Sequence, residues 1–369
     1  MVQARLLLPI ALSVALPALA APAVPGAADA GPRTVRKSRA VFGAVVEILA
    51  SVPARDGAGA PAEAAPFEAA PFETALDEVA RVEALVDEDN PKSGVARINA
   101  AAGGAPVVVD PELFSVLSEA VRLAKLTKGA FDVTAAAYDA AWRFGGDTAP
   151  TVDPASGEAD GRDAVPTKRD IDRMRALVGV DDLVLDPAAR TVRLKQAGAR
   201  IGLRTVARGY ALERGAAVLE AAGVSSFVVS AGGDLVVRGQ KGDRPWMVGV
   251  QDPRAAGHFA ALPATDKAVM TTGDYEAFFF DGGVRYHNVI DPRTGQPATK
   301  CRSVTVLAKD ALVAEALSRA VFVLGARDGI ALVERLKDVD AVVVTADNRV
   351  VASRGIKDVL QHRPPTDGP

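Results

Sequence analysis

Apolar residues recur at the spacing of a helix in several stretches of the chain. Positions 76, 79, 82 and 86 are all Leu or Val and mark one face of an amphipathic helix. Asp110-Pro111-Glu112 begins another helix, because it supplies a capping side chain, a proline at the first helical position and an acid in the first turn. The same reasoning predicts further helices over about 168–177, 206–222, 311–324 and 328–336.

Short β-rich runs lie between these helices. They predict strands at 41–49, 227–229, 246–250, 303–307 and 341–345, and a hairpin over 183–194. Strands and helices follow one another without a regular strand–helix–strand period, so we expect an α+β fold, a single domain of mixed sheets with packed helices. The length of 369 residues gives ample chain to bury a core.

The two ends of the chain differ in composition from its middle. Arg5 precedes an apolar run that ends at Ala18-Leu19-Ala20, the layout of a secretory signal peptide over residues 1–20. The run is short and contains proline, which argues against the alternative of an uncleaved membrane anchor. We expect a flexible linker over 21–36, the folded domain over 37–360 and a C-terminal tail over 361–369. The mature protein is then expected in the periplasm, with no membrane span after signal cleavage.

Composition narrows the functional classes. The net charge is −3 and there is no long basic run, so we expect no nucleic-acid partner. One cysteine excludes an internal disulfide, and the three histidines are not spaced as a metal-binding pair. Oxygen ligands must therefore hold any metal, which favours magnesium or calcium. Two stretches, at 53–71 and 147–162, are rich in small residues and proline and are expected to be surface loops.

Four short polar segments that carry glycine stand at the ends of apolar runs. They cover residues 127–134, 230–234, 270–275 and 287–295. Functional sites tend to form where loops meet rigid elements, and glycine lets the backbone approach a ligand. Each segment taken alone is equally typical of an ordinary turn. Their order and spacing along the chain are what point to a shared function.

Taken together, these segments resemble the FAD:protein FMN transferase family, also called ApbE-like. The resemblance runs from about Ser38 to Asp358 and includes 93–99, 142–145, 207–210, 246–253 and 314–325. It implies an exported α+β enzyme that uses FAD as substrate and binds Mg²⁺. Such an enzyme joins FMN, through its phosphate, to a Ser or Thr hydroxyl of a client protein and releases AMP. The implied clients are exported electron-transfer subunits.

The resemblance also assigns site residues by position. Those matching the family's catalytic positions are Asn288 and Asp291, and those matching its metal positions are Thr205, Glu315 and Arg319. Those matching its FAD-binding positions are Phe42, Asp89, Ala130, Phe131, Asp132, Gly202, Arg208, Gly232, Gly233, Thr272 and Val289.

Several of these positions depart from the family pattern. Gly202 replaces an aspartate that contacts FAD, Asp89 replaces an aromatic residue, and Asn288 replaces a histidine although His287 lies next to it. Arg319 stands where the family has a threonine ligand, and a guanidinium has no acceptor atom for a metal. The plain alternative is that Glu315 and Arg319 form an ordinary i,i+4 salt bridge.

The departures suggest that arginines have replaced the magnesium ion. Relative to the family, the changes at 202, 204 and 319 each add one positive unit, about the charge that a lost dication would remove. Arg204 and Arg319 would then neutralise phosphate in an electropositive cleft shared by Asp132, Thr205 and Arg208. Three functions stay open: an exported flavin transferase, a catalytically degenerate FAD-binding accessory protein of the same fold, or a scaffold that docks a partner.

Overall fold

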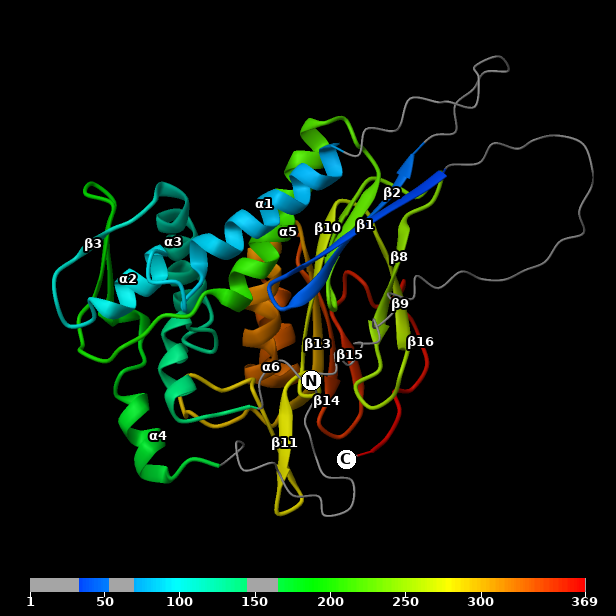
Figure 1. Ribbon diagram of the computed structural model, residues 1–369. Coiled ribbons are helices and arrows are strands. Elements are labelled where there is room, and N and C mark those ends of the chain that lie inside the picture. The colour runs from blue at the N-terminus through cyan, green and yellow to red at the C-terminus, as the bar shows by residue number, and fades with distance from the viewer. Residues whose placement is uncertain (1–32, 53–69, 145–164, 369) are drawn as a thin grey trace, which may run out of the picture.

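The computed structural model describes residues 33–52, 70–144 and 165–368 (Figure 1). The expected signal peptide at 1–20 lies outside the described residues, as do most of the two expected loops and of the linker. The described part of the chain is an α+β fold, as the sequence predicted.

The main sheet of the described part has eight strands in the order β1-β2-β6-β7-β10-β13-β14-β15, and every neighbouring pair is antiparallel. These strands are β1 Arg33–Val41, β2 Ala44–Val52, β6 Phe227–Ala231, β7 Asp234–Arg238, β10 Lys267–Gly273, β13 Cys301–Ala308, β14 Asp340–Thr345 and β15 Val350–Ala352.

Smaller sheets surround it. One has the order β16-β9-β8, with β8 Trp246–Gln251, β9 His258–Ala264 and β16 Gln361–His362. Another has the order β3-β5-β4, with β3 Val107–Val108, β4 Leu183–Asp186 and β5 Thr191–Leu194. A hairpin joins β11 Phe278–Asp281 to β12 Val284–His287.

The α-helices are α1 Ala70–Val86, α2 Gly94–Ala100, α3 Pro111–Leu126, α4 Lys168–Arg175, α5 Arg204–Ala221 and α6 Ala311–Val333. Short 3₁₀ helices follow α3 and α4, namely η1 Val133–Ala140 and η2 Val180–Asp182. Gly325 has a φ of +83° and a non-helical ψ of 171°, so α6 is two helical pieces joined at a kink, as the sequence predicted.

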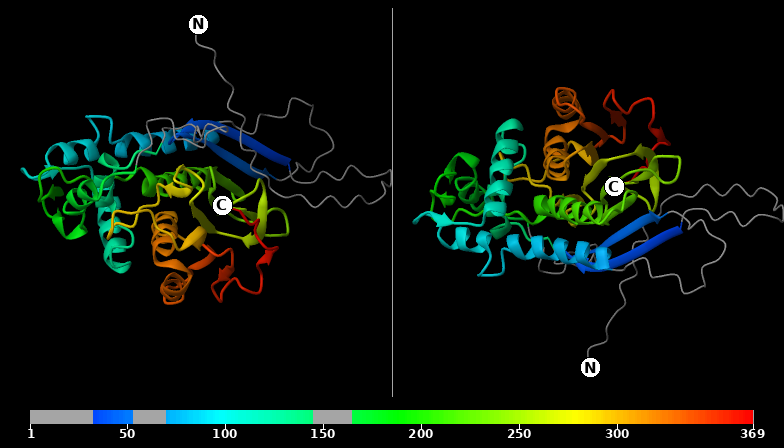
Figure 2. Two further views of the ribbon diagram at one scale, coloured as in Figure 1. Left: turned by 90° about the horizontal axis from the view of Figure 1, so that it is seen from below. Right: turned by 90° about the horizontal axis from the view of Figure 1, so that it is seen from above.

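The main sheet is buried on both faces because its strands alternate between two apolar clusters. Ile48, Val229 and Val343 point toward the cluster that α1, α5 and α6 share, while Leu49 and Val228 point toward β8 and β9. Figures 1 and 2 show these helices on one side of the sheet and β8, β9 and β16 on the other. These three helices therefore cover one face of the main sheet only.

Two boundaries differ from the sequence prediction. The expected strand 41–49 is broken at a turn in which Phe42 and Gly43 have φ of +56° and +67°, and an antiparallel hairpin results. Its first strand begins at Arg33, within the segment expected to be a linker. The expected C-terminal tail contains β16, which pairs with β9, and the Thr366 backbone N–H donates to Asp252.

The other predicted elements are confirmed within a few residues. Asp110 caps α3 by accepting a hydrogen bond from the Glu112 backbone N–H at 2.8 Å, as its position before Pro111 indicated. Gly223, with a φ of +81°, directly follows the end of α5. In the described ranges, no helix is both long and apolar enough to cross a membrane.

Candidate active site

A cavity of about 910 Å³ lies where the helical layer meets the edge of the β11–β12 hairpin. Its walls come from the β1–β2 turn, the loop after α1, the start of η1, the first turns of α5, the segment around Asn288 and the middle of α6. A space of this size accommodates a nucleotide-sized ligand.

Most of the site residues expected from the sequence line this cavity. They are Phe42, Asp89, Ala130, Phe131, Asp132, Gly202, Arg204, Arg208, Asn288, Val289 and Arg319. Segments separated by up to 277 positions along the chain (42 to 319) thus meet in one space. The backbone of Thr205 is in the first turn of α5, and its side chain lies outside the described part.

Five expected residues do not line the cavity. Gly232 and Gly233 form the β6–β7 turn, and Thr272 is buried with its hydroxyl 2.7 Å from that of Ser318. The Asp291 carboxylate accepts two hydrogen bonds from the Arg293 guanidinium, which fixes the turn after Asn288. The Glu315 carboxylate is 1% exposed and lies beneath Arg319. These residues can shape the site but do not face its space.

A buried ion pair supports the cavity floor. Arg208 reaches it from α5, and its guanidinium pairs with Asp234, which is fully buried. Asp234 also accepts a hydrogen bond at 3.0 Å from the backbone N–H of Thr271. The negative charge of Asp234 is the main reason that the pKa of Arg208 is raised. Two of the polar segments singled out in the sequence, 230–234 and 270–275, therefore act through Arg208 and not by lining the cavity.

The segment 287–295 is tied to η1 and the residues just after it by aromatic side chains. The Tyr138 hydroxyl donates to the Pro292 carbonyl at 3.0 Å, and the Trp142 indole N–H donates to the Gly295 carbonyl at 2.8 Å. Trp142 also stacks on Phe144, with ring centroids 5.6 Å apart. Trp142 and Phe144 line the cavity and offer a flat apolar wall against which a ring can stack.

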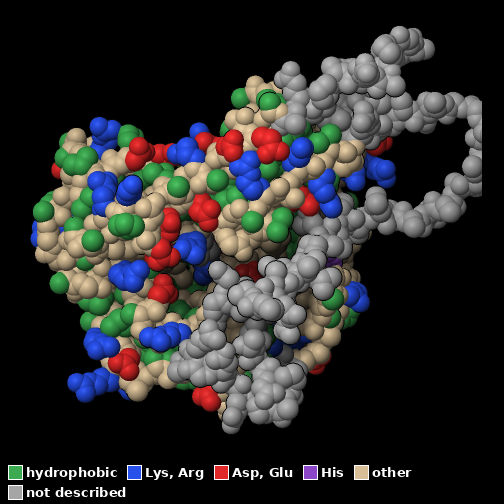
Figure 3. All heavy atoms as spheres, in the orientation of Figure 1, with side chains coloured by type: hydrophobic (Ala, Val, Ile, Leu, Met, Phe, Trp, Pro, Cys, Tyr) green, Lys and Arg blue, Asp and Glu red, His purple; other side chains and the backbone are tan. Residues whose placement is uncertain are grey.

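The charges around the cavity are mixed, not simply positive. Among its described lining residues are five arginines (143, 200, 204, 208 and 319) and five carboxylates (88, 89, 132, 139 and 276). Figure 3 likewise shows both signs of charge interspersed over the face in view. The expectation of an electropositive cleft is thus corrected. Burial raises the pKa of Glu88, which makes this acid easier to protonate than an ordinary carboxylate.

The histidine next to Asn288 cannot substitute for the family's histidine in the cavity. The His287 Nδ1 accepts from the Val289 backbone N–H at 3.2 Å, and Nε2 lies 2.8 Å from the Ala298 carbonyl. This arrangement requires the neutral ring with its proton on Nε2. Burial also lowers the pKa of His287. Its role is to hold the turn that places Asn288 in the cavity.

Glu88 brings a carboxylate beside Gly202, the position at which the resemblance implied an aspartate. A Cβ atom at Gly202 would lie 2.8 Å from the Ala136 Cβ and 3.1 Å from Glu88 Oε1. Glu88 lies on the loop after α1, and its carboxylate is 3.8 Å from the Arg200 guanidinium. No sequence motif marked Glu88, because Glu88 and Gly202 are far apart in the chain.

Substituting Gly202 by Ala should therefore destabilise the protein and displace Glu88. We expect a loss of about 1–3 kcal/mol, since the new methyl group overlaps a packed neighbour. Gly233→Ala is the matched control, because its Cβ would meet only Thr271 at an ordinary 3.9 Å. Urea unfolding of both variants measures the difference. Equal stabilities would show that the space beside Gly202 is not filled as described.

The buried carboxyl group of Glu315 should make the free energy of unfolding depend on pH. Burial and the neighbouring Asp234 raise its pKa from 4.5 to about 8. Between these values the folded protein holds a proton that the unfolded chain has released, so the free energy of unfolding falls as pH rises from about 4.5 to 8. Glu315→Gln removes this contribution, on the order of a few kcal/mol at pH 8. Urea unfolding at pH 5 and 8 should show a smaller difference for this variant than for the wild type.

The fold and the cavity define an α+β protein whose helical layer and β11–β12 hairpin enclose one large polar site. The chain matches the ApbE family over residues 42–343 and belongs to that family. It is 36% identical over 288 residues to the FAD:protein FMN transferase of Treponema pallidum, covering 75% of this chain and 77% of that protein. It is 30% identical over 260 residues to the protein of the same name from Vibrio cholerae, covering 69% and 74%.

Solved structures of the family have the same fold. The ApbE protein of Thermotoga maritima superposes with a TM-score of 0.74 at 28% identity, covering 89% of this chain and 99% of that one. The flavin transferase ApbE of Vibrio cholerae gives a TM-score of 0.72 at 25% identity, with 89% and 99% covered.

The residues at the positions that the resemblance assigned to a metal do not fit a magnesium ion. Arg319 offers only donors, and its Nε is 3.9 Å from Glu315 Oε1, so a cation already neighbours that carboxylate. The Glu315 carboxylate is also shut off from the cavity. Across the described ranges, no three His, Cys, Asp or Glu residues are grouped so that they could hold a metal ion.

Proposed function

We propose that this protein transfers FMN from FAD to a Ser or Thr hydroxyl of a client protein and releases AMP. One observation carries the proposal: Arg208, Arg319 and the aromatic wall of Trp142 and Phe144 face one cavity large enough for FAD. Stacking suits the flavin or adenine ring, and guanidinium groups suit the diphosphate between them. The two relatives described above are both named FAD:protein FMN transferase, which supports the same reaction.

In the reaction that we propose, one bond forms and one breaks, both at the phosphorus of the FMN half. The client hydroxyl oxygen forms a bond to the phosphorus of the FMN half, and the bond from that phosphorus to the bridging oxygen breaks. AMP leaves with that oxygen, and the hydroxyl proton passes to a base. Charge develops on the phosphate oxygens, and arginines already in place stabilise it. Glu276 lines the cavity and interacts with Arg208 and Arg319, so it can accept the proton.

In this proposal arginine replaces the metal ion of the family. Arg319 faces the cavity at a position where a metal ligand is expected, and Arg204 stands at the start of α5 on the same cavity. Arg204 also contacts Asp89, which lines the same cavity, at 3.2 Å. A guanidinium supplies fixed positive charge and directed donors to phosphate. FAD binding then needs no divalent ion.

Export completes the proposal. Residues 1–20 resemble a signal peptide and support export to the periplasm, where an exported electron-transfer subunit would be the client.

Removing divalent metal should leave FAD binding unchanged. Titration calorimetry with FAD in the presence of EDTA, and again with added MgCl₂, is expected to give the same Kd within about twofold. Mass spectrometry of the client after incubation with FAD and EDTA should show the mass of FMN less water. A Kd that weakens tenfold or more in EDTA would contradict the arginine site. Metal-free FAD binding without any client modification would contradict the transferase.

A second function is favoured by Asn288. This residue faces the cavity where the family has a histidine, and its amide cannot take up a proton at neutral pH. A protein that binds FAD tightly without transferring FMN is therefore the competing function. The mass measurement on the client separates the two.

A further inference from the structure

The turn between β1 and β2 forms part of the wall of the FAD-sized cavity. Phe42, Gly43 and Ala44 all line the cavity, and Phe42 also belongs to the main apolar cluster, with 8% of its surface exposed. Val41 pairs with Ala44, so the turn has two central residues, Phe42 and Gly43. The conformation of these two residues therefore decides how the Phe42 ring is presented to a ligand.

Phe42 is an unfavourable residue for this turn. Phe42 and Gly43 have φ of +56° and +67°, as the central residues of a type I′ turn do. Such turns favour the pair Asn-Gly, because asparagine tolerates a positive φ and a bulky aromatic residue does not. Backbone strain of this kind persists only where the surrounding structure holds it, and it is concentrated at binding and active sites.

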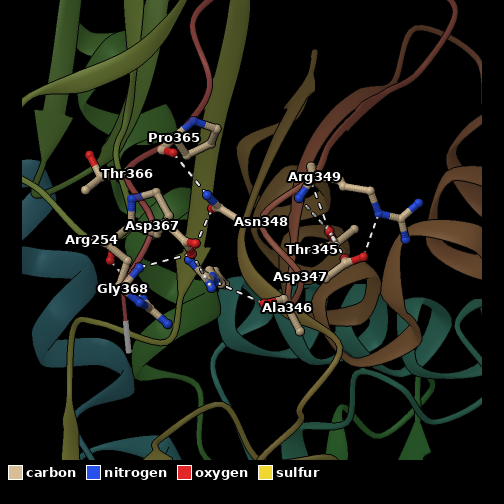
Figure 4. A network of polar contacts seen from close by, with 12 residues as sticks. Arg254, Thr345, Ala346, Asp347, Asn348, Arg349, Pro365, Thr366, Asp367 and Gly368 are labelled. Carbon is tan, nitrogen blue, oxygen red and sulfur yellow. Dashed lines mark hydrogen bonds and ion pairs between the residues drawn. The ribbon is translucent and has the colours of Figure 1, made fainter.

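The turn between β14 and β15 shows how the chain meets the same requirement elsewhere. Asn348 has a φ of +63° there, and its side chain donates to the Pro365 carbonyl at 3.0 Å and accepts from Arg302 at 3.1 Å (Figure 4). This turn carries a residue type that is suited to a positive φ, and it does not line the cavity. The β1–β2 turn instead needs support from another element.

Glu83 of α1 supplies that support. The Phe42 backbone N–H donates to Glu83 Oε1 at 2.7 Å, in a partly buried contact. α1 lies alongside β1 (Figure 1), and its acids Glu73 and Asp77 pair with the side chain of Arg39 in β1. Exposed ion pairs contribute little stability, whereas a hydrogen bond from a backbone N–H to a carboxylate is among the stronger kinds. Glu83 thus acts on the backbone of the turn itself.

We propose that Glu83 is a positioning residue, whose carboxylate holds the β1–β2 turn so that Phe42 packs against a ring of bound FAD. Glu83 does not itself line the cavity, so it acts through Phe42. A turn that is free to leave this conformation is competent to bind only part of the time, and the apparent Kd rises by the inverse of that fraction. The contact with FAD rests on the proposed function, but the hold on the turn does not.

The test compares Glu83→Ala with Glu83→Gln, because glutamine keeps an oxygen that can accept from the Phe42 N–H and alanine does not. Titration calorimetry on the whole protein should give a Kd for FAD about tenfold higher in Glu83→Ala and within about threefold of the wild type in Glu83→Gln, since one charge-assisted hydrogen bond contributes about tenfold. Hydrogen exchange of the Phe42 amide, followed by NMR without FAD, should be faster by about tenfold in Glu83→Ala only. An unchanged exchange rate in Glu83→Ala would overturn the proposal.

Glu334→Ala is the matched control. The Glu334 carboxylate also accepts from a backbone N–H at 2.7 Å, that of Arg354, and neither residue lines the cavity. This variant should leave the Kd for FAD within about twofold of the wild type. Equal losses of FAD binding in Glu334→Ala and Glu83→Ala would reveal a general effect of stability and contradict the positioning role. Equal losses in Glu83→Ala and Glu83→Gln would contradict it too, because the acceptor oxygen would not matter.

A second background tests whether Glu83 acts through the turn. Phe42→Asn gives the turn the Asn-Gly pair that its conformation favours, so the turn no longer depends on Glu83. Adding Glu83→Ala to Phe42→Asn should then change the Kd for FAD by less than about twofold, and a further tenfold loss would refute the proposal. A wild type that binds no FAD would defeat the proposed function, and the exchange rate of the Phe42 amide would still decide whether Glu83 holds the turn.

Discussion

Replacement of Arg319 by glutamine is expected to lower the rate of FMN transfer by about 10²–10³-fold. Arg319 faces the cavity from the middle of α6, where a cation can reach the phosphate that becomes more negative in the transition state. Removing one preorganised donor at such a position typically costs this much. Glutamine keeps most of the length and removes the charge. Single-turnover transfer to the client, followed by mass spectrometry, measures the effect.

The control for this prediction is Arg335→Gln, which removes an exposed arginine just beyond α6 and should leave the rate unchanged. A companion variant carries Glu315→Asp with Arg319→Thr and so restores the family's residue types at both positions. We expect this double variant to depend on MgCl₂ while the wild type does not. An unchanged rate in Arg319→Gln, or a wild type that needs Mg²⁺, would show that arginine has not replaced the metal.

Replacement of Arg208 by alanine is expected to destabilise the fold by about 3–5 kcal/mol and to abolish FAD binding. Asp234 is completely buried, and without Arg208 its charge would have no partner at that side. Breaking a buried pair by removing one member costs this much because a desolvated charge is left behind. Urea unfolding at pH 7 measures the stability, and flavin fluorescence measures the binding.

Pairing this change with Asp234→Asn separates the two effects. The double variant should regain a large part of the lost stability, because no buried charge remains, but it should still fail to bind FAD. Arg208→Lys should keep much of the stability and weaken FAD binding only in part, since lysine retains the charge but not the planar fork. Full recovery of FAD binding in the double variant would mean that Arg208 serves the fold alone.

Local chemistry determined most of the secondary structure. The cap at Asp110, the apolar positions of α1 and the Gly223 terminus are signals within a few residues of the element they control, and each was read from the sequence. The strand prediction at 41–49 was wrong at its start because Phe42 adopts a positive φ there, a conformation that an aromatic residue rarely takes. The Phe42 backbone N–H donates to the Glu83 carboxylate of α1 at 2.7 Å, a tertiary contact that helps to hold this turn.

The sequence alone determined the family and the α+β class, because these are carried by local motifs and their order, and about two thirds of the site residues that it predicted line the cavity. Tertiary structure alone decided which motif residues face the cavity and which support it, as with Asp234 behind Arg208 and Asp291 on Arg293. It also brought in Glu88, Asp139 and Glu276, which no motif marked as site residues. The physical reason is that burial and charge pairing depend on neighbours distant in the chain, and those neighbours exist only after the sheet and helices have packed.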